Sequence, residues 1–370
     1  MRILHILYES KGDYFGIGGV GMRAYEIYTR LKERHKITLL CKKYPGARDR
    51  EIEGLCHIFV GSESRSLTVT LLSYAYKAAL FVREKAEEFD LIVEEFSPAV
   101  PTFLHAITKK PVVLQVQGYT GRLYFRKYNP VYASVLSLLE RFRPSRYSNF
   151  IFINRETERR LSPDAGKNIK IIPNGVDLEL LDLPLQQGGY IFYLGRIDVY
   201  GKGLDLLANA YAEFYTSFPG VKLVIAGDGR DMEEFKSILM GLPDGARRNV
   251  ELTGWVTGKR KKEVLQGARF AVFPSRHEIQ PIAVLEALAC GKSVVVSDIP
   301  EFGFVLRQKA GLSFKTGDAS SLAASMKSLA ESDESSAMGR SGKEWVKTFT
   351  WDRIAEQYEK FLLETLERRK

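Results

Sequence analysis

The sequence has little that would indicate a metal centre or a disulfide framework. Its three cysteines, Cys41, Cys56 and Cys290, are odd in number and share no metal-type spacing, which favours a reducing compartment. The five histidines are scattered along the chain and form no metal motif. No D-x-D pair occurs anywhere in the sequence, so we expect no metal site built on paired aspartates.

Long hydrophobic runs are also missing. Residues 1–8 form too short an apolar run for a signal peptide. Lys77 interrupts 67–82, the longest largely apolar stretch, which is too short for a spanning helix. The chain has no internal repeat, and its hydrophobic content is 45%. Its 370 residues therefore predict a soluble protein with two domains of ordinary size.

The charge balance is positive. The chain has 54 basic and 45 acidic residues, which gives a formal net charge of +9. Such an excess is compatible with an anionic partner, namely phosphate groups, a nucleic acid or an acidic bilayer surface. It is equally compatible with a charged surface that only keeps the protein soluble, so the charge alone selects no function.

Short apolar strands alternate with amphipathic helices along almost the whole chain, as is typical of parallel sheets buried on both faces. The alternation restarts at Tyr190, which predicts an α/β protein with two doubly wound, Rossmann-like domains. We expect domains at 1–172 and 173–350, a final helix at 351–370, and a ligand site in a cleft where the two domains face each other. The predicted strands are 3–8, 36–40, 91–95, 112–116, 150–153, 191–194, 222–227, 250–254, 270–273 and 293–297, and helices are predicted near 22–33 and 67–88.

Residues 273–296 indicate a strand, a polar loop, a buried helix, a glycine turn and a second strand. We expect Pro281 in the first helical turn, where its missing N–H costs nothing, and Gly291 at the end of the helix. The free N–H groups of Ile282 and Ala283 at the start of this helix are suited to holding a phosphate.

Two carboxylates belong to this stretch, Glu278 in the loop and Glu286 inside the apolar helix. A buried carboxylate is costly unless hydrogen bonds or a counter-charge satisfy it. Two neighbouring hydroxyls of a ribose would satisfy Glu286, and so would a buried Lys or Arg. The sequence leaves both interpretations open.

The loop at 195–203 follows a predicted strand and contains Arg196 and Lys202. Two cations at the carboxyl end of a strand suit a diphosphate, with Arg as a planar fork and Lys as a mobile point charge. Two solvated surface charges are the alternative.

Three further loops are weaker indications. The glycine-rich segment 16–21, which includes Gly18 and Gly19, matches a dinucleotide-binding fingerprint only loosely, but its small residues allow close approach to an anion or a sugar. The loops at 226–229 and 253–256 end two strands of the second domain and could flank a nucleotide base.

Together these segments resemble the GT-B glycosyltransferases, and among them the large retaining group called family 4. The resemblance covers nearly the whole chain and is strongest from 172 to 351. The motifs that carry it are the E-x7-E pair Glu278 and Glu286 followed by A-x-A-C-G ending at Gly291, the pair Arg196 and Lys202, IPNGVD at 172–177, FTWD at 349–352, and the glycine loop at Gly18 and Gly19.

The resemblance implies an acceptor-side first domain, a second domain that binds a nucleoside-diphosphate sugar, and a last helix that packs back on the first domain. It implies that Glu286 holds the ribose hydroxyls and Glu278 those of the transferred sugar. The other implied donor contacts are Arg196, Lys202, Ile282 and Ala283 at the phosphates, Val256 at the base, and Gly18 and Gly19 in the glycine loop; Arg196, Lys202 and Glu278 are the implied catalytic residues.

Two positions depart from the family pattern. After the first Glu the family usually has Gly, an aromatic and Gly, whereas this chain has Ile279, Gln280 and Pro281, which changes the shape of the sugar pocket. Many members carry a His where this chain has Gln117. Gln117 is therefore a candidate contact for the sugar or the acceptor that cannot share a proton as His does.

The implied reaction moves a sugar from a UDP or GDP donor to a glycan or lipid-linked acceptor, with retention, without metal and without a cofactor. A GT-B-fold sugar-nucleotide epimerase is the alternative, because it would use the same fold and donor. A nucleic-acid-binding protein and a nicotinamide dehydrogenase are further alternatives. Nothing in the chain resembles a nucleic-acid module, so we expect no nucleic-acid partner.

The segment 119–147 holds seven aromatic and six basic residues, with Glu140 its only acid. Such a segment suits an anionic membrane surface or a lipid diphosphate acceptor, and it equally suits a helix with core aromatics and a solvated basic face. We expect a cytoplasmic protein, with peripheral association at the inner membrane face under the first interpretation. The basic run 259–262 is predicted to be the surface start of a helix.

Overall fold

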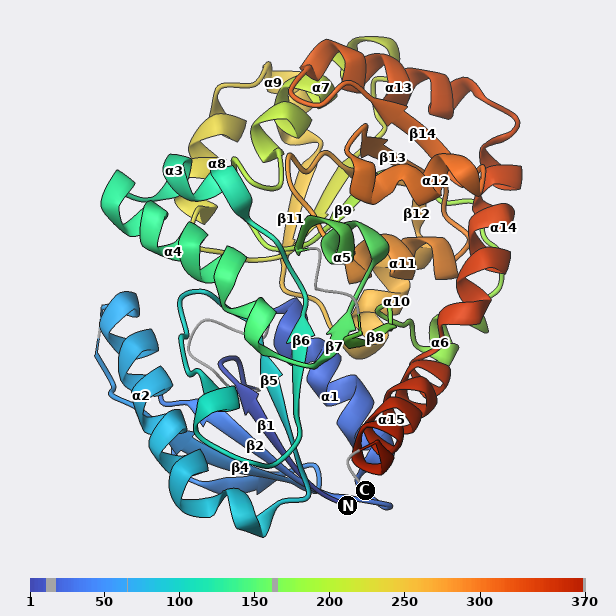
Figure 1. Cartoon of the computed structure of the whole chain (residues 1–370). Helices are drawn as coiled ribbons and strands as arrows, with labels where there is room; N and C mark the ends of the chain where they lie inside the picture. Colours follow the sequence, from blue (N-terminus) through green and yellow to red (C-terminus); the bar gives the residue numbers. More distant parts are fainter. Residues whose placement is uncertain (11–17, 65, 162–165, 369–370) are drawn as a thin grey trace. The chain divides into compact units, whose positions relative to one another are not determined.

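The computed structural model describes residues 1–10, 18–64, 66–161 and 166–368. The chain divides into two compact α/β units (Figure 1). The first unit combines Met1–Asn174 with Trp351–Lys370, and the second comprises Gly175–Thr350.

The described part of the first unit contains an eight-stranded sheet with the order β3-β4-β2-β1-β5-β6-β7-β8. Its neighbours pair in parallel except β3 and β4, which are antiparallel. The central strands β1, β5 and β6 are almost wholly buried, as continuous apolar runs predict. The strands are β1 Arg2–Leu7, β2 Lys36–Lys42, β3 Arg50–Ile52, β4 Leu55–Val60, β5 Leu91–Glu95, β6 Val112–Val116, β7 Asn149–Phe152 and β8 Asn168–Ile171.

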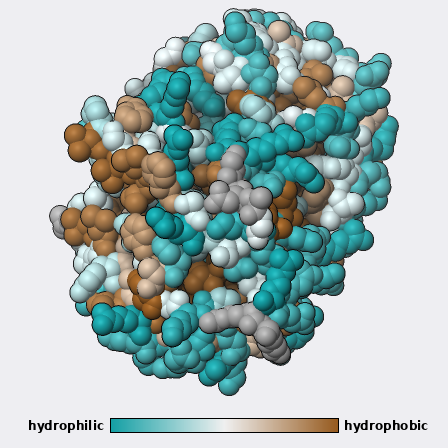
Figure 2. Space-filling view, viewed as in Figure 1, coloured by the Kyte–Doolittle hydropathy of each residue, from teal (hydrophilic) through white to brown (hydrophobic). Residues whose placement is uncertain are grey.

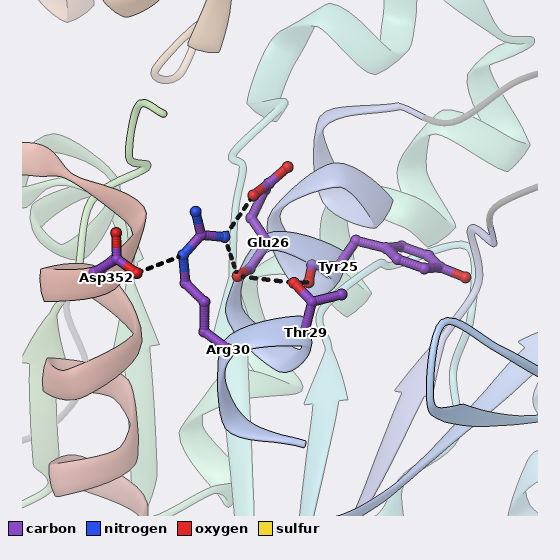
Figure 3. A network of polar contacts seen from close by, with 5 residues as sticks. All are labelled: Tyr25, Glu26, Thr29, Arg30 and Asp352. Carbon is purple, nitrogen blue, oxygen red and sulfur yellow. Dashed lines mark hydrogen bonds and ion pairs between the residues drawn. The ribbon is translucent and has the colours of Figure 1, made fainter. Parts of the chain in front are cut away.

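The last helix of the chain, α15, packs on α1 of the first unit. The hydroxyls of Tyr28 and Tyr358 lie 3.2 Å apart in the buried contact. Figure 3 shows the guanidinium of Arg30 between Glu26, at 2.7 Å, and Asp352, at 3.0 Å. The helices of this unit are α1 Gly19–Leu31, α2 Leu67–Lys85, α3 Tyr124–Lys127, α4 Pro130–Phe142, α5 Arg155–Leu161 and α15 Trp351–Glu367, with 3-10 turns at Ala86–Glu88, Leu104–Ala106, Gly121–Leu123 and Pro144–Arg146.

The second unit is built on a six-stranded, wholly parallel sheet with the order β11-β10-β9-β12-β13-β14 in its described residues. One apolar cluster covers each face of this sheet. The strands are β9 Tyr190–Leu194, β10 Leu223–Ala226, β11 Val250–Gly254, β12 Ala268–Phe273, β13 Val294–Ser297 and β14 Gly311–Phe314. The helices are α6 Leu178–Leu181, α7 Leu204–Ser217, α8 Met232–Met240, α9 Asp244–Arg248, α10 Gly258–Gln266, α11 Ile282–Ala289, α12 Gly303–Arg307, α13 Ala319–Glu331 and α14 Ser335–Val346, with 3-10 turns at Pro300–Phe302 and Lys347–Phe349.

The predicted α/β architecture with two parallel sheets is confirmed, and each predicted strand is present with small shifts of its ends. The helix predicted near 22–33 is present as α1, which begins earlier than expected, at Gly19 with Gly18 as its N-cap. Four strands were not predicted: β3, β4, β8 and β14. Among the described residues, no helix is both long enough and apolar enough to cross a membrane.

Candidate functional site

The loops that end the strands of the second unit all lie at one edge of its sheet, because the strands are parallel. Four of the residues singled out from the sequence belong to these loops. Arg196 and Lys202 follow β9, Val256 follows β11, and Glu278 follows β12. This edge is the candidate site.

Close backbone contacts hold the loop after β9 against the loop after β12. Gly203 has a φ of +66°, and a Cβ there would collide with the carbonyl oxygen of Pro274. The backbone N–H of Arg276 donates to the carbonyl of Gly201 at 3.0 Å. The Arg276 guanidinium also forms two bonds of 2.7 Å with the carboxylate of Asp205. The two loops therefore form one rigid support.

Lys202 and Glu278 form an ion pair across this support. The hydroxyl of Ser275 donates to the same Glu278 oxygen at 2.8 Å. The carboxylate is only 11% exposed, so both bonds offset its loss of water. The structure thus brings together two of the residues that the sequence singled out separately.

Arg196 is exposed, and its guanidinium forms no ion pair with a described residue. Its backbone carbonyl accepts a hydrogen bond of 3.0 Å from the buried hydroxyl of Tyr193. Burial raises the pKa of Tyr193 well above its ordinary value, the carboxylates of Glu278 and Asp198 raise it further, and Arg196 opposes them. Glu278 and Arg196 therefore have opposite effects on the pKa of the same hydroxyl.

Glu286 is paired with a cation, the second of the two interpretations left open by the sequence. Lys261 of α10 lies 2.6 Å from its carboxylate, and the side chains are 20% and 10% exposed. The prediction that 259–262 is only a surface helix start is wrong for Lys261. The missed signal is spacing: Val264 and Leu265 are three and four residues beyond Lys261, so the lysine shares the buried face of the helix.

The helix that carries Glu286, α11, is buried from Val284 to Ala289 as predicted. Pro281 is not in the first turn: it is the N-cap, with an extended ψ of 121°. The first N–H bonded to a described backbone carbonyl is that of Val284, to Pro281 at 3.2 Å. The N–H groups of Ile282 and Ala283 precede it at the partly buried end of the helix.

Val256 is buried in the apolar cluster that also contains Val264 and Val284. Its side chain therefore packs in the core, and only its backbone groups are suited to contacting a ligand.

In the first unit, the N-terminus of α1 carries Gly18 and Gly19. The Glu9 carboxylate accepts a bond of 2.9 Å from the N–H of Gly21, and a Cβ on Gly18 would meet this carboxylate. Residues 16 and 17 of the glycine-rich segment lie outside the described part of the chain. Gln117, after β6, donates from its amide to Glu95 at 2.9 Å.

Part of the basic and aromatic segment 119–147 is buried in the interior of the first unit. Arg143 is buried and paired with Glu94, and the hydroxyl of Tyr147 donates to the same carboxylate at 2.7 Å. Glu140 is buried too and accepts bonds from the N–H groups of Thr120 and Gly121 at 2.8 Å. The interpretation of the whole segment as a surface is therefore wrong for these residues.

No group of three or more His, Cys, Asp or Glu side chains in the described part of the chain is placed to hold a metal ion.

Comparisons with known proteins agree on the class. The sequence profile described as "Glycosyltransferase Family 4" matches residues 17–180, and that of "Glycosyl transferases group 1" matches 188–332. A phosphatidyl-myo-inositol mannosyltransferase from Mycobacterium leprae is 30% identical over 201 residues, which is 52% of each chain. The matched region thus spans about half the length of that relative.

Solved structures match over the whole chain. A sucrose-phosphate synthase from Thermosynechococcus elongatus has a TM-score of 0.78 and 19% identity, with 100% of both chains covered. Anabaena HepE in complex with UDP and glucose has a TM-score of 0.76 and 16% identity, with 98% of this chain and 100% of that one covered.

These matches define a two-domain GT-B fold. The chain belongs to the family 4 type of GT-B glycosyltransferases.

Lys261 and Glu286 should be energetically coupled. In a double-mutant cycle with Lys261→Met and Glu286→Gln, we expect a coupling of about 0.5–3 kcal/mol in the free energy of unfolding, because both groups are largely buried. Urea unfolding measures it. The exposed pair Lys259 and Glu263 on the same helix is the control, with a coupling below about 1 kcal/mol. Strictly additive losses at 261 and 286 would contradict the pairing.

Proposed function

We propose that this protein transfers a sugar from a nucleoside-diphosphate sugar to a glycan or lipid-linked acceptor. The observation that carries the proposal is the ion pair between Lys202 and Glu278 on the carboxyl edge of the second sheet, where Arg196 belongs to the same loop as Lys202. This edge is where open α/β sheets bind ligands. Family membership supports the reaction class.

The diphosphate of the donor suits the cations of this edge. Arg196 is exposed and offers a planar fork, and Lys202 can exchange the Glu278 carboxylate for a phosphate oxygen. The N–H groups of Ile282 and Ala283 add donors at the start of α11. As the sugar–phosphate bond breaks, negative charge grows on the leaving diphosphate, and donors already in place stabilise it by about 3 kcal/mol each.

The two carboxylates then accept hydrogen bonds from hydroxyl groups of the donor. Glu278, released by Lys202, accepts from hydroxyls of the transferred sugar, while Ser275 keeps it in place. Glu286 accepts from the ribose with Lys261 at its other side. The backbone at Val256 meets the base. In the first unit, Gly18 and Gly19 approach the donor and Gln117 contacts the sugar or the acceptor.

The donor is a UDP or GDP sugar. UDP is the nucleotide named with Anabaena HepE, and the mycobacterial relative is named a mannosyltransferase. Transfer proceeds with retention, by attack on the face that the phosphate leaves, and protein cations take the place of a divalent ion at the diphosphate. The first unit receives the acceptor, and the protein works in the cytoplasm.

Lys202→Ala and Glu286→Ala should each weaken binding of the donor. For Lys202→Ala we expect a Kd about 10- to 100-fold higher, because a charge-assisted bond to phosphate is lost. Calorimetry with UDP-glucose and GDP-mannose measures the change. Lys259→Ala, an exposed lysine on α10, is the matched control and should leave the Kd unchanged. Unchanged affinity in both site variants would remove the assignment.

Transfer or donor hydrolysis should persist in EDTA, because Arg196 and Lys202 neutralise the leaving diphosphate. Product is measured with and without the chelator, and again after magnesium is added. Complete loss in EDTA that magnesium reverses would contradict metal-independent catalysis.

We also propose that the first unit associates with an anionic membrane surface. On α4, Val131, Val135, Leu138 and Phe142 are 76%, 46%, 56% and 58% exposed, and their spacing places them on one helical face. Figure 2 shows hydrophobic side chains in the part of the view where Figure 1 places α3 and α4. The exposed cations Arg141 and Arg146 supply attraction to anionic lipid.

The protein should co-sediment with vesicles that contain phosphatidylserine, and salt should weaken the binding. Val131→Ser with Leu138→Ser should reduce the bound fraction several-fold, because less apolar area enters the interface. Met240→Ser, which changes a side chain 65% exposed in the second unit, is the control. Failure to sediment at low salt would exclude this association.

A further inference from the structure

Two adjacent glutamates end β5 and point to opposite faces of the first sheet. Glu94 has a full set of partners, which are the guanidinium of Arg143 and the hydroxyls of Thr102 and Tyr147. These contacts within the first unit account for the burial of this carboxylate.

Glu95 is just as buried, at 2% exposure, but its partners differ. One carboxylate oxygen accepts from the side-chain amides of Gln115 and of Gln117, the latter at 2.9 Å. Nε2 of His5 lies 3.2 Å from the same oxygen. No described Lys or Arg forms an ion pair with Glu95. Two neutral amides therefore supply hydrogen bonds to this carboxylate, and the buried guanidinium of Arg23 acts on it through space.

This arrangement fixes which atom of Gln117 faces outward. A carboxylate oxygen only accepts hydrogen bonds, so the amide nitrogen of Gln117 must turn toward Glu95. The carbonyl oxygen Oε1 then turns away from it. His5, Glu95 and Gln115 are buried, whereas Gln117 is only half-buried. Gln117 is thus the end of the cluster that a ligand can reach, and it presents an acceptor.

We infer that Glu95 is a positioning residue, which holds Gln117 so that its carbonyl oxygen accepts a hydrogen bond from a hydroxyl of the transferred sugar. The inference rests on the proposed function and adds to it the atom that faces the sugar. With a glutamine at 95, the neighbouring group offers both N–H and C=O. Gln117 could then turn either way, and its acceptor would no longer be fixed.

The test separates the sugar from the nucleotide. Calorimetry gives the Kd of UDP and UDP-glucose, and of GDP and GDP-mannose, for each variant. The ratio of the nucleotide Kd to the nucleotide-sugar Kd measures what the sugar contributes. We expect Glu95→Gln to lower this ratio about 2-fold, because Gln117 then presents its acceptor only about half of the time, and to leave the nucleotide Kd unchanged.

Two variants at 117 show whether Glu95 acts through this residue. Gln117→Leu removes the acceptor and should lower the ratio about 3- to 10-fold, which is the loss of one neutral hydrogen bond. Glu95→Gln added to it should change nothing further. Gln117→His should keep the ratio, because an imidazole that donates one N–H to Glu95 presents its other nitrogen as an acceptor. Glu88→Gln, which removes an exposed carboxylate of the same unit, is the control.

Other outcomes overturn the inference. One is a Kd ratio that is unchanged in Glu95→Gln, and another is equal weakening of nucleotide and nucleotide-sugar binding in that variant. Additive losses in the double variant at 95 and 117 would also overturn it, as would a ratio of one in the wild-type protein. If Glu95→Gln lowers the Tm, the contrast between Gln117→Leu and Gln117→His decides. A wild-type protein that binds none of the four probes would refute the proposed function itself, and the inference with it.

Discussion

A carboxylate removed from water must receive hydrogen bonds or a counter-charge, and this requirement organises both units. In the second unit Glu278 is held by Lys202 and Ser275, and Glu286 by Lys261. In the first unit Glu94 is held by Arg143. Each pair joins segments that are distant in the sequence, so each carboxylate also fixes the relative position of two elements.

The parallel sheet of the second unit determines where these groups meet. Every strand delivers its following loop to one edge, and the loops then have to fit one another. Gly203 is needed for this fit, because its positive φ and its closeness to Pro274 leave no room for a side chain. Arg276 bonds both the neighbouring backbone and Asp205. The cation and the carboxylate of the candidate site are thus placed by backbone packing as well as by their own attraction.

The sequence predicts most of the fold because buried parallel strands are continuous apolar runs. It misses β4, whose exposure alternates along the strand, and β8, which is only half-buried at the sheet edge. It singles out Glu286 and leaves its partner open. Lys261 belongs to a run of basic residues that resembles a solvated helix start. Its spacing to Val264 and Leu265 indicates that it turns inward, but only the packing of α10 shows that Glu286 is its partner. Pairings of this kind depend on tertiary contacts that no local pattern encodes.

Glu278 in the second unit and Glu95 in the first are satisfied in chemically different ways. A lysine is a mobile point charge, so the partner of Glu278 can exchange a carboxylate oxygen for a phosphate oxygen at little cost. The amides that hold Glu95 are neutral, and a competing anion gains little from displacing them. They have a direction, however, because nitrogen and oxygen are not interchangeable beside a carboxylate. An ion pair of this kind therefore suits the binding of a charged group, and the amide cluster suits the recognition of a neutral hydroxyl by its orientation.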